Sequence, residues 1–285
     1  MSELTDISRD EIAMATLVEL TGAFEGIASM RIAQIKDQVQ RSKVFFDELW
    51  QIYSQLKAGT GFSFGRDETG EIIDKQLFII ITSEGSFSGD IDHKLVKLML
   101  QDYDKDKNDI IVIGHHGAIQ LAQQGISYKK YFKLPGKDTG INTQPIIREV
   151  RKYISTKLFY QEYVSLMVQD VKRIELSTVV QEQGQSSNKS SDLISQDTYI
   201  FEPSTYAVAA HLERSMMQIA ISQLILGSKL AQYASRFRAM SASHDRAEES
   251  RSDLRLAYNH AKRAIKDERL KEVVNGLKKA KLGSR

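Results

Sequence analysis

Cysteine is absent from this sequence of 285 residues. Its absence excludes disulfide bonds, thiolate metal sites and cysteine nucleophiles, and it fits a reducing compartment. Proline is scarce, since Pro135, Pro145 and Pro203 are the only three. Two long stretches, before residue 135 and after residue 203, therefore lack the strongest breaker of helices, and both are open to long helical structure.

The sequence also lacks an excess of charge of one sign. It has 39 Lys plus Arg against 37 Asp plus Glu, so the net charge of +2 gives no reason to expect nucleic acid as a partner. No uninterrupted apolar run approaches the roughly 18 residues of a membrane span, and Leu77 to Ile81 is the longest candidate. Met1 to Arg9 lacks the layout of a signal peptide. With 41% hydrophobic residues, we expect a soluble cytoplasmic protein with a packed core.

The stretch after Pro203 has a heptad pattern, in which steps of four and three residues alternate. This period of about 3.5 is typical of helices that supercoil around a partner. Ser204 can cap the helix, no breaker follows before Gly276, and a helix from Ser204 to Lys281 would be about 115 Å long, so we expect it to need a partner or a socket. The seam positions are Gln223, Leu226, Leu230, Tyr233, Phe237, Met240, His244, Ala247, Arg251, Leu254, Tyr258, Ala261 and Ile265. Its polar members, His244 and Arg251, either fix the register of the coil or face another protein.

The N-terminal stretch supplies a candidate partner helix with two apolar seams. The first is Leu17, Leu20, Phe24 and Ile27, and the second is Ile35, Val39, Ser42, Phe46, Leu49, Tyr53 and Leu56. The two seams are out of phase, which predicts a re-registered coil near Met30 to Gln34. Gly22 and Gly26 each cost about 1 kcal/mol relative to alanine in a helix, and close approach of another helix would explain them.

The middle of the chain has the alternation of an α/β domain. Leu77 to Thr82 and Asp109 to Gly114 are predicted strands, and Leu95 to Gln101 and Ala118 to Gln124 are predicted helical segments. This order predicts a parallel sheet with right-handed crossovers. A further helix over Thr143 to Phe159, an extended segment over Tyr163 to Val180 and a polar loop over Gln181 to Ser191 complete the interpretation. The predicted domains are residues 1–58, a coiled-coil helix, 70–200, an inserted α/β domain, and 204–282, a second coiled-coil helix.

Motifs for catalysis or for ligand binding are weak. Thr82 to Asp92 lacks both the lysine of a P-loop and a three-glycine dinucleotide fingerprint. His115 and His116 follow a predicted strand but have no partner at metal-ligand spacing, and a polar turn explains them best. The acidic run from Asp102 to Asp109 lacks the glycine and the glutamate of a calcium loop. We therefore expect no catalytic residue, no cofactor and no metal in this chain.

Four blocks after residue 198 resemble the C-terminal half of the gamma subunits of F-type ATP synthases. They are Tyr199 to Ser204 (YIFEPS), Ser228 to Met240 (SKLAQYASRFRAM), Leu254 to Asn259 (LRLAYN) and Ala261 to Val274 (AKRAIKDERLKEVV). Thr21 to Arg31 (TGAFEGIASMR) is similar to the family's T-K-A-M-x-M-V-A-A-x-K, and Ile81 to Asp92 is similar to its I-T-S-D-x-G-L-C-G-x-L-N. The turn at Gly85 to Asp90 departs from the family pattern, because it has lost a cysteine and a glycine, and Gln232 replaces a glutamate.

The resemblance implies α/β architecture with long helices: an antiparallel coiled coil of the two terminal helices with an inserted Rossmann-like α/β domain. It implies the central rotor of an F-type ATP synthase, which couples ion flow to ATP synthesis or hydrolysis while the chemistry stays in the beta subunits. The implied partners are the alpha and beta subunits, the epsilon subunit and the membrane c-ring. The implied location is peripheral, on the cytoplasmic face of the bacterial plasma membrane, without a span of its own.

The resemblance also implies contact residues. Lys262 and Arg263 lie where the family has an Arg-Gln pair that contacts the catch loop of the beta subunit. Tyr199 and Glu202 match residues that touch the c-ring loops. Three more positions fall in the bearing region of the shaft: Arg31 takes the place of a lysine, and Phe24 and Gly26 replace two methionines.

Two other classes of protein remain open from the residues alone. A coiled-coil scaffold, or the rotor of a non-standard F-type-like motor, would also use the apolar seams. An enzyme built on the α/β domain would have Ser83, His115 and His116 as its polar candidates. The block from Tyr258 to Val274 favours a rotor over a generic scaffold, which has no reason to contain it.

Overall fold

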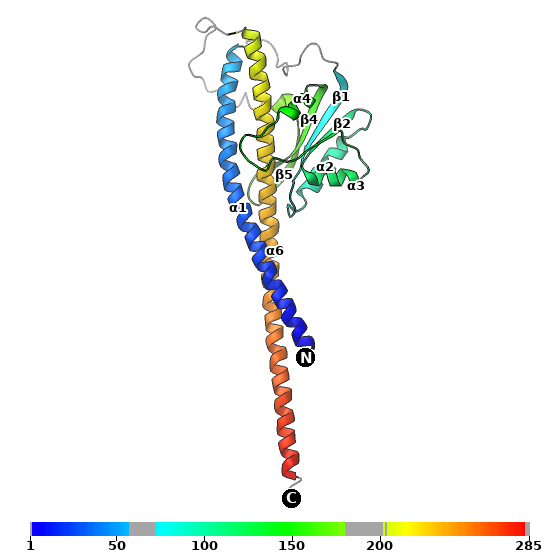
Figure 1. Ribbon diagram of the computed structural model, residues 1–285, viewed down its shortest axis with the longest axis vertical. Helices are drawn as coiled ribbons and strands as arrows, with labels where there is room; N and C mark the ends of the chain where they lie inside the picture. The colour runs from blue at the N-terminus through cyan, green and yellow to red at the C-terminus, as the bar shows by residue number, and fades with distance from the viewer. Residues whose placement is uncertain (1, 57–71, 180–201, 203, 283–285) are drawn as a thin grey trace. The chain divides into compact units, whose positions relative to one another are not determined.

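The computed structural model describes residues 2–56, 72–179, 202 and 204–282, and Figure 1 shows the elements that they form. Two long helices, at the beginning and at the end of the chain, flank an α/β region. In chain order the elements are α1 (Ser2–Leu56), β1 (Ile73–Ile81), α2 (Ile91–Asp102), β2 (Asn108–Ile113), α3 (His115–Gln123), β3 (Lys130–Phe132), α4 (Gln144–Val150), β4 (Tyr153–Tyr163), β5 (Gln169–Glu175) and α6 (Thr205–Leu282). The predicted class, an α/β fold with long terminal helices, is confirmed.

The chain divides into two compact units, and both long helices contribute to each. Residues 28–237 form the sheet unit, and residues 1–27 with 238–285 form the helix-pair unit. In the sheet unit, Tyr53 of α1 contacts Glu213 of α6, and Ile35 packs with Leu226. In the helix-pair unit, Thr21 contacts His244. Residues later in α1 contact residues earlier in α6, so the two helices pair antiparallel.

The sheet has five strands in the order β3-β2-β1-β4-β5. β1 lies in the centre and pairs parallel with β2 and with β4, and β3 pairs parallel with β2, whereas β5 pairs antiparallel with β4. This strand order, 3-2-1-4-5, is that of the doubly wound folds. The chain moves outward from β1 to β2 and β3 and then returns to the other side of β1, so the topological switch point lies beside β1. The expectation of a purely parallel sheet is therefore corrected at one edge strand.

The helix predicted over Thr143 to Phe159 is wrong beyond its first turns. α4 ends at Val150, and β4 begins at Tyr153. The strand is specified by its neighbours, because β4 pairs with β1 on one side and with β5 on the other. Such pairing overrides local helix propensity. The polar loop predicted over Gln181 to Ser191 lies outside the described residues.

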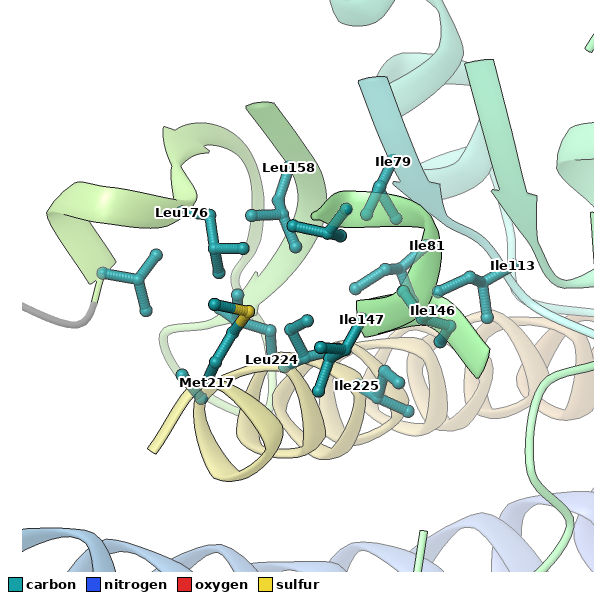
Figure 2. Packing of buried hydrophobic residues seen from close by; sticks show 14 of the residues in the cluster. Ile79, Ile81, Ile113, Ile146, Ile147, Leu158, Leu176, Met217, Leu224 and Ile225 are labelled. Carbon is teal, nitrogen blue, oxygen red and sulfur yellow. The ribbon is translucent and has the colours of Figure 1, made fainter. Parts of the chain in front are cut away.

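Both faces of the sheet are covered. Leu77, Ile79 and Ile81 of β1 belong to a core that includes α4 and α6 side chains, whereas Phe78 and Ile80 belong to a second core with α2 and α3. Figure 2 shows the first core, in which Met217, Leu224 and Ile225 of α6 lie beneath sheet and α4 residues. This alternation explains why β1 is almost continuously apolar, as strands with two buried faces are.

The seam predicted on the last helix is confirmed along α6. Every seam position from Gln223 to Ile265 is buried or half-buried, whereas most intervening positions beyond residue 244 are exposed. The seam ends at Ile265, because residues 266–278 are all exposed. The final part of α6 therefore has no packing partner within the described chain.

The first seam predicted on α1 is wrong. Leu17, Leu20 and Ile27 are 43%, 50% and 47% exposed. The face of α1 that is at least half-buried consists of Met14, Val18, Thr21, Glu25, Ala28, Ile32, Ile35, Val39, Ser42, Phe46, Leu49 and Tyr53. These positions alternate steps of four and three without a break, so no re-registration occurs near Met30 to Gln34. Small and polar residues on this face concealed the seam from the search for large apolar side chains.

One described helix meets the length and composition of a membrane span. It covers Leu4–Tyr53 in α1, where a window has a mean hydropathy of 1.3. Core helices of soluble proteins meet the same test when they are mostly buried, but only 6% of this window is buried, although α1 pairs with α6 in both units. The absence of a span thus stays a prediction from the sequence.

Candidate functional site

A buried polar cluster lies at the carboxyl end of the central strand, where doubly wound sheets commonly bind ligands. We call it the Asp92 cluster, and it consists of Ser83, Ser88, Asp92, His116 and Gln161. Ser83 follows β1, Asp92 lies in the first turn of α2, His116 begins α3 and Gln161 lies in β4. The topology therefore brings together residues that are up to 78 positions apart in the sequence.

The Asp92 carboxylate is the centre of this cluster and is only 3% exposed. Its Oδ1 accepts hydrogen bonds from the Ser83 backbone N–H (3.1 Å) and from Gln161 Nε2 (2.8 Å). Its Oδ2 contacts the hydroxyls of Ser83 and Ser88 and lies 3.1 Å from His116 Nδ1. A buried carboxylate requires this density of donors, because it would otherwise be too costly to desolvate.

The cluster has the residue types of a serine hydrolase but not the geometry. His116 Nδ1 lies 3.0 Å from Ser83 Oγ and 3.1 Å from Asp92 Oδ2, so the same nitrogen faces both partners. A catalytic triad needs the two ring nitrogens to take separate partners, one for the nucleophile and one for the orienting acid. Ser83 is also buried. This arrangement differs from that of a catalytic triad and connects the loop after β1 with α2 and α3.

Two glycines permit the close approach beneath this cluster. Gly114 has φ +98°, and a Cβ there would lie 2.0 Å from the carbonyl oxygen of Thr82. A Cβ at Gly117 would lie 2.8 Å from both Thr82 Cγ2 and Oγ1.

The interpretation of His115 and His116 as a polar turn is corrected by the structure, because they begin helix α3, and His116 contacts Asp92.

The residues expected to contact the beta subunit lie on the helix-pair unit. Lys262 and Arg263 are exposed on α6, and the Lys262 ammonium lies 5.6 Å from the centroid of the Tyr258 ring. Neither side chain has an acidic partner within salt-bridge distance among the described residues. Both remain available for hydrogen bonds to another chain.

The expected bearing residues divide between the two units. Phe24 is half-buried and Gly26 exposed in the helix-pair unit. Close helix approach requires glycine at neither position, because an added Cβ would make only an ordinary contact with His244 at 3.6 Å from Gly22 and would meet nothing within 4 Å at Gly26. Arg31 lies in the sheet unit, 3.4 Å from Asp138. Its guanidinium is thus partly engaged within the chain.

The residues expected to touch the c-ring are only partly described. Glu202 is exposed, and Tyr199 lies outside the described residues. In the same sheet unit, the buried Lys229 ammonium donates to the Pro135 carbonyl (2.8 Å) and pairs with Asp138, the carboxylate that Arg31 also contacts. Among the described residues, the expected contact residues are divided between the two units.

The helix-pair unit exposes several large apolar side chains. On α1 they include Ile12 (62%), Leu17, Leu20 and Ile27, the residues of the mispredicted seam among them. On the last part of α6, Leu270, Val273 and Leu277 are 66%, 61% and 61% exposed. Monomeric proteins rarely leave so many large apolar residues in water along one element, so such surfaces indicate binding to other chains.

The fold and this surface define the class as a long-helix protein with an inserted doubly wound domain. Solved chains with this fold include one from the Euglena gracilis mitochondrial ATP synthase, in the assembly titled OSCP/F1/c-ring, with a TM-score of 0.66 at 12% identity over 99% of this chain and 96% of that one. A chain from the rotor of the same organism's ATP synthase has a TM-score of 0.60 at 13% identity over 92% and 99%. These likenesses concern the fold.

Sequence comparison gives the family. The ATP synthase family profile matches residues 5–279. The ATP synthase gamma chain of Exiguobacterium sp. is 22% identical over 97% of this chain and 98% of its own length, and that of Streptococcus suis is 25% identical over 90% and 92%. The chain belongs to the ATP synthase family, and its resemblance to the gamma subunits is confirmed.

Proposed function

We propose that this chain is the central shaft of an F-type ATP synthase and transmits torque between a membrane c-ring and a catalytic ring of alpha and beta subunits. One observation supports it most directly: the last part of α6 has an apolar stripe that no described residue of this chain covers. Leu270, Val273, Val274 and Leu277 follow the spacing i, i+3, i+4, i+7 of one helix face, and all four are exposed. A stripe of this kind on a helix needs a socket from other chains.

The proposed contacts follow from charge and position. Lys262 and Arg263 would meet the catch loop of a beta subunit, because exposed cations without an acidic partner among the described residues suit hydrogen bonds to carboxylates and carbonyls. Phe24, Gly26 and Arg31 would lie in the bearing region. The division into residues 1–58, 70–200 and 204–282 stays part of this proposal.

A second set of proposed contacts concerns the membrane. Tyr199 and Glu202 would touch the loops of the c-ring, with an epsilon subunit nearby. The gamma chains of Exiguobacterium sp. and Streptococcus suis, which are similar to this chain, come from bacteria, and this supports a membrane-associated complex. The finer location, peripheral on the cytoplasmic face of the plasma membrane, is our proposal.

The experiment is co-expression with the alpha and beta subunits encoded beside this chain, followed by size-exclusion chromatography and an ATPase assay. We expect a stoichiometric complex whose turnover depends on this chain. Changing Lys262→Ala with Arg263→Ala should lower turnover about tenfold, the effect of losing one charge-assisted contact of about 1.4 kcal/mol.

A matched control is Lys271→Ala with Lys278→Ala, which removes the same charge from α6 on a face roughly opposite Lys262. Its turnover should exceed that of the first double variant severalfold. A chain that elutes alone and leaves turnover unchanged would reject the shaft and favour a coiled-coil scaffold. A complex with normal turnover in the Lys262 and Arg263 variant would retain the shaft and reject only this contact.

A further inference from the structure

The loop between β1 and α2 is held in an unfavourable backbone conformation. Phe87 has φ +68° and is 56% exposed. A positive φ is costly for a bulky side chain, by about 1–3 kcal/mol, and persists only where the surrounding contacts impose it. Residues 84–90, which we call the clamp loop, therefore need anchors on both sides.

α6 supplies one set of anchors. Ser235 Oγ donates to the Ser88 carbonyl at 2.7 Å. Arg236 donates through Nε to the Ser86 carbonyl (3.0 Å) and through Nη2 to the Gly85 carbonyl (3.2 Å). Three successive hydrogen bonds thus fasten the clamp loop to one turn of the long helix.

The Asp92 cluster supplies the second set. Ser88 donates to Asp92 Oδ2 at 3.2 Å from inside the loop, and Gln161 connects Asp92 to α6, because Gln232 Nε2 donates to its Oε1 at 3.2 Å. The same carboxylate therefore contacts the loop, the sheet and, through one amide, α6. The stability of this junction depends on the charge that Asp92 bears and on what compensates it.

The positive charge of a protonated His116 compensates the negative charge of Asp92. The His116 side chain is 27% exposed, whereas that of Asp92 is 3% exposed. The charged groups that face it from the packed elements are Asp92 on α2, Glu84 on the clamp loop and Arg236 on α6; β4 contributes only the neutral Gln161. The hydrogen bond to Asp92 raises the pKa of His116. Burial of the ring and the positive charge of Arg236 lower the pKa, whereas the negative charges of Asp92 and Glu84 raise it further, so the net shift is upward.

We propose that Asp92 and His116 form a protonation-controlled clamp, which fastens the clamp loop to α6 while His116 is protonated and loosens it when the proton leaves. The neutral ring retains one N–H for Asp92, but the buried carboxylate then has no compensating cation within the cluster. The proposal concerns the chain itself and does not depend on its role as a shaft.

The direction in pH follows from linkage. The pKa of His116 is raised in the folded chain, so its stabilisation is complete below the ordinary imidazole value of 6.5 and is lost as the pH rises through the folded value. Increasing alkalinity should therefore release the loop without unfolding the chain.

The test is amide hydrogen exchange of the clamp loop in the full chain at about pH 5.5 and about pH 8.5, each corrected for the intrinsic exchange rate. We expect protection to fall about threefold to tenfold at the higher pH, the range for a partly buried ion pair. Asp92→Asn should abolish this fall in protection, because it removes the negative charge that a protonated His116 compensates. The asparagine oxygen can still accept the hydrogen bonds of Oδ1, and its amide can donate to the serines. His115→Gln, at the exposed neighbouring position, should retain it.

His116→Gln is the second variant, and imidazole NMR titration of the unmodified chain is the independent measurement. Protection in His116→Gln should not vary with pH, and His116 should titrate above its ordinary value together with the loop amides. Equal protection at both pH values, or a pH effect that survives in both variants, would overturn the clamp. If Asp92→Asn does not fold, a His116 midpoint at or below the ordinary value overturns it, and a raised midpoint shared with the loop supports it.

Discussion

The sheet unit and the helix-pair unit use the same two helices and treat their apolar residues in opposite ways. In the sheet unit, α1 and α6 pack with the sheet, and Leu158, Ile79 and Met217 are fully buried. In the helix-pair unit, Leu17, Leu20 and Leu270 are exposed. The first unit thus completes its own core, whereas the second leaves large apolar side chains exposed among the described residues, a surface that suits binding to other chains.

The largest expected difference between the units comes from one substitution made in each. Leu158→Ala removes a side chain that is 0% exposed and should cost about 2–5 kcal/mol of unfolding free energy, because it leaves a cavity. Leu270→Ala changes a side chain that is 66% exposed and should stay within about 0.5 kcal/mol. Urea titration of both variants measures this, and comparable losses would contradict the division. Leu270→Ala should instead weaken assembly with the alpha and beta subunits.

A smaller effect concerns polar contacts in the sheet unit. Glu149 is 5% exposed and contacts Lys130 (2.7 Å) and Lys152 (3.0 Å). Burial opposes ionisation, but the hydrogen bonds to the two lysines prevail and lower the pKa of Glu149. Glu149→Gln should therefore cost about 1 kcal/mol at neutral pH.

The sign of the pH dependence can be tested on the same variant. A lowered folded pKa means that the stabilisation is present above the ordinary value of 4.5 and is lost as the pH falls through the folded value. The difference between the Glu149→Gln variant and the unmodified chain should therefore shrink during acid titration, as followed by circular dichroism. A difference that grows towards acid pH would show that Glu149 is not stabilised as an anion.

The smallest effect belongs to the helix-pair unit. Gly26 has nothing within 4 Å of the position of an added Cβ, so Gly26→Ala should stabilise α1 by about 0.5–1 kcal/mol through helix propensity. Thermal unfolding of the chain alone measures the gain. Gly22→Ala, where the Cβ would make an ordinary contact with His244 at 3.6 Å, is the matched comparison and should gain at least as much. A loss at Gly26 would show that this position is packed in solution.

What could be predicted from the sequence depended on how many positions repeat one pattern. The α6 seam was readable because its steps of four and three continue from Gln223 to Ile265. The α1 seam was not, because Thr21, Glu25 and Ala28 face the partner while the larger Leu17 and Leu20 face outward. Closely paired helices favour small residues between them. A search for large apolar side chains therefore misses the face of α1 that packs against its partner helix.

The sheet edge shows a second limit. Ser83 and His116 were recognised as polar candidates, but Asp92 and Gln161 join them only through the order of the strands. The strand β4 was mistaken for helix, and with it the position of Gln161 beside Asp92 was lost. No spacing in the sequence encodes a contact between residues 69 positions apart. The family resemblance supplied the architecture, whereas the internal electrostatics required coordinates.

Gly114 and Gly117 have a consequence for how this chain can vary. Each lies where any larger residue would overlap Thr82, with distances of 2.0 Å and 2.8 Å for an added Cβ. A saturation library covering the sheet edge should therefore recover glycine almost exclusively at position 114, where the positive φ adds to the overlap, and chiefly glycine at position 117. Variants at these two positions should be depleted because the destabilised protein is less abundant, and not because a surface that binds a partner has changed.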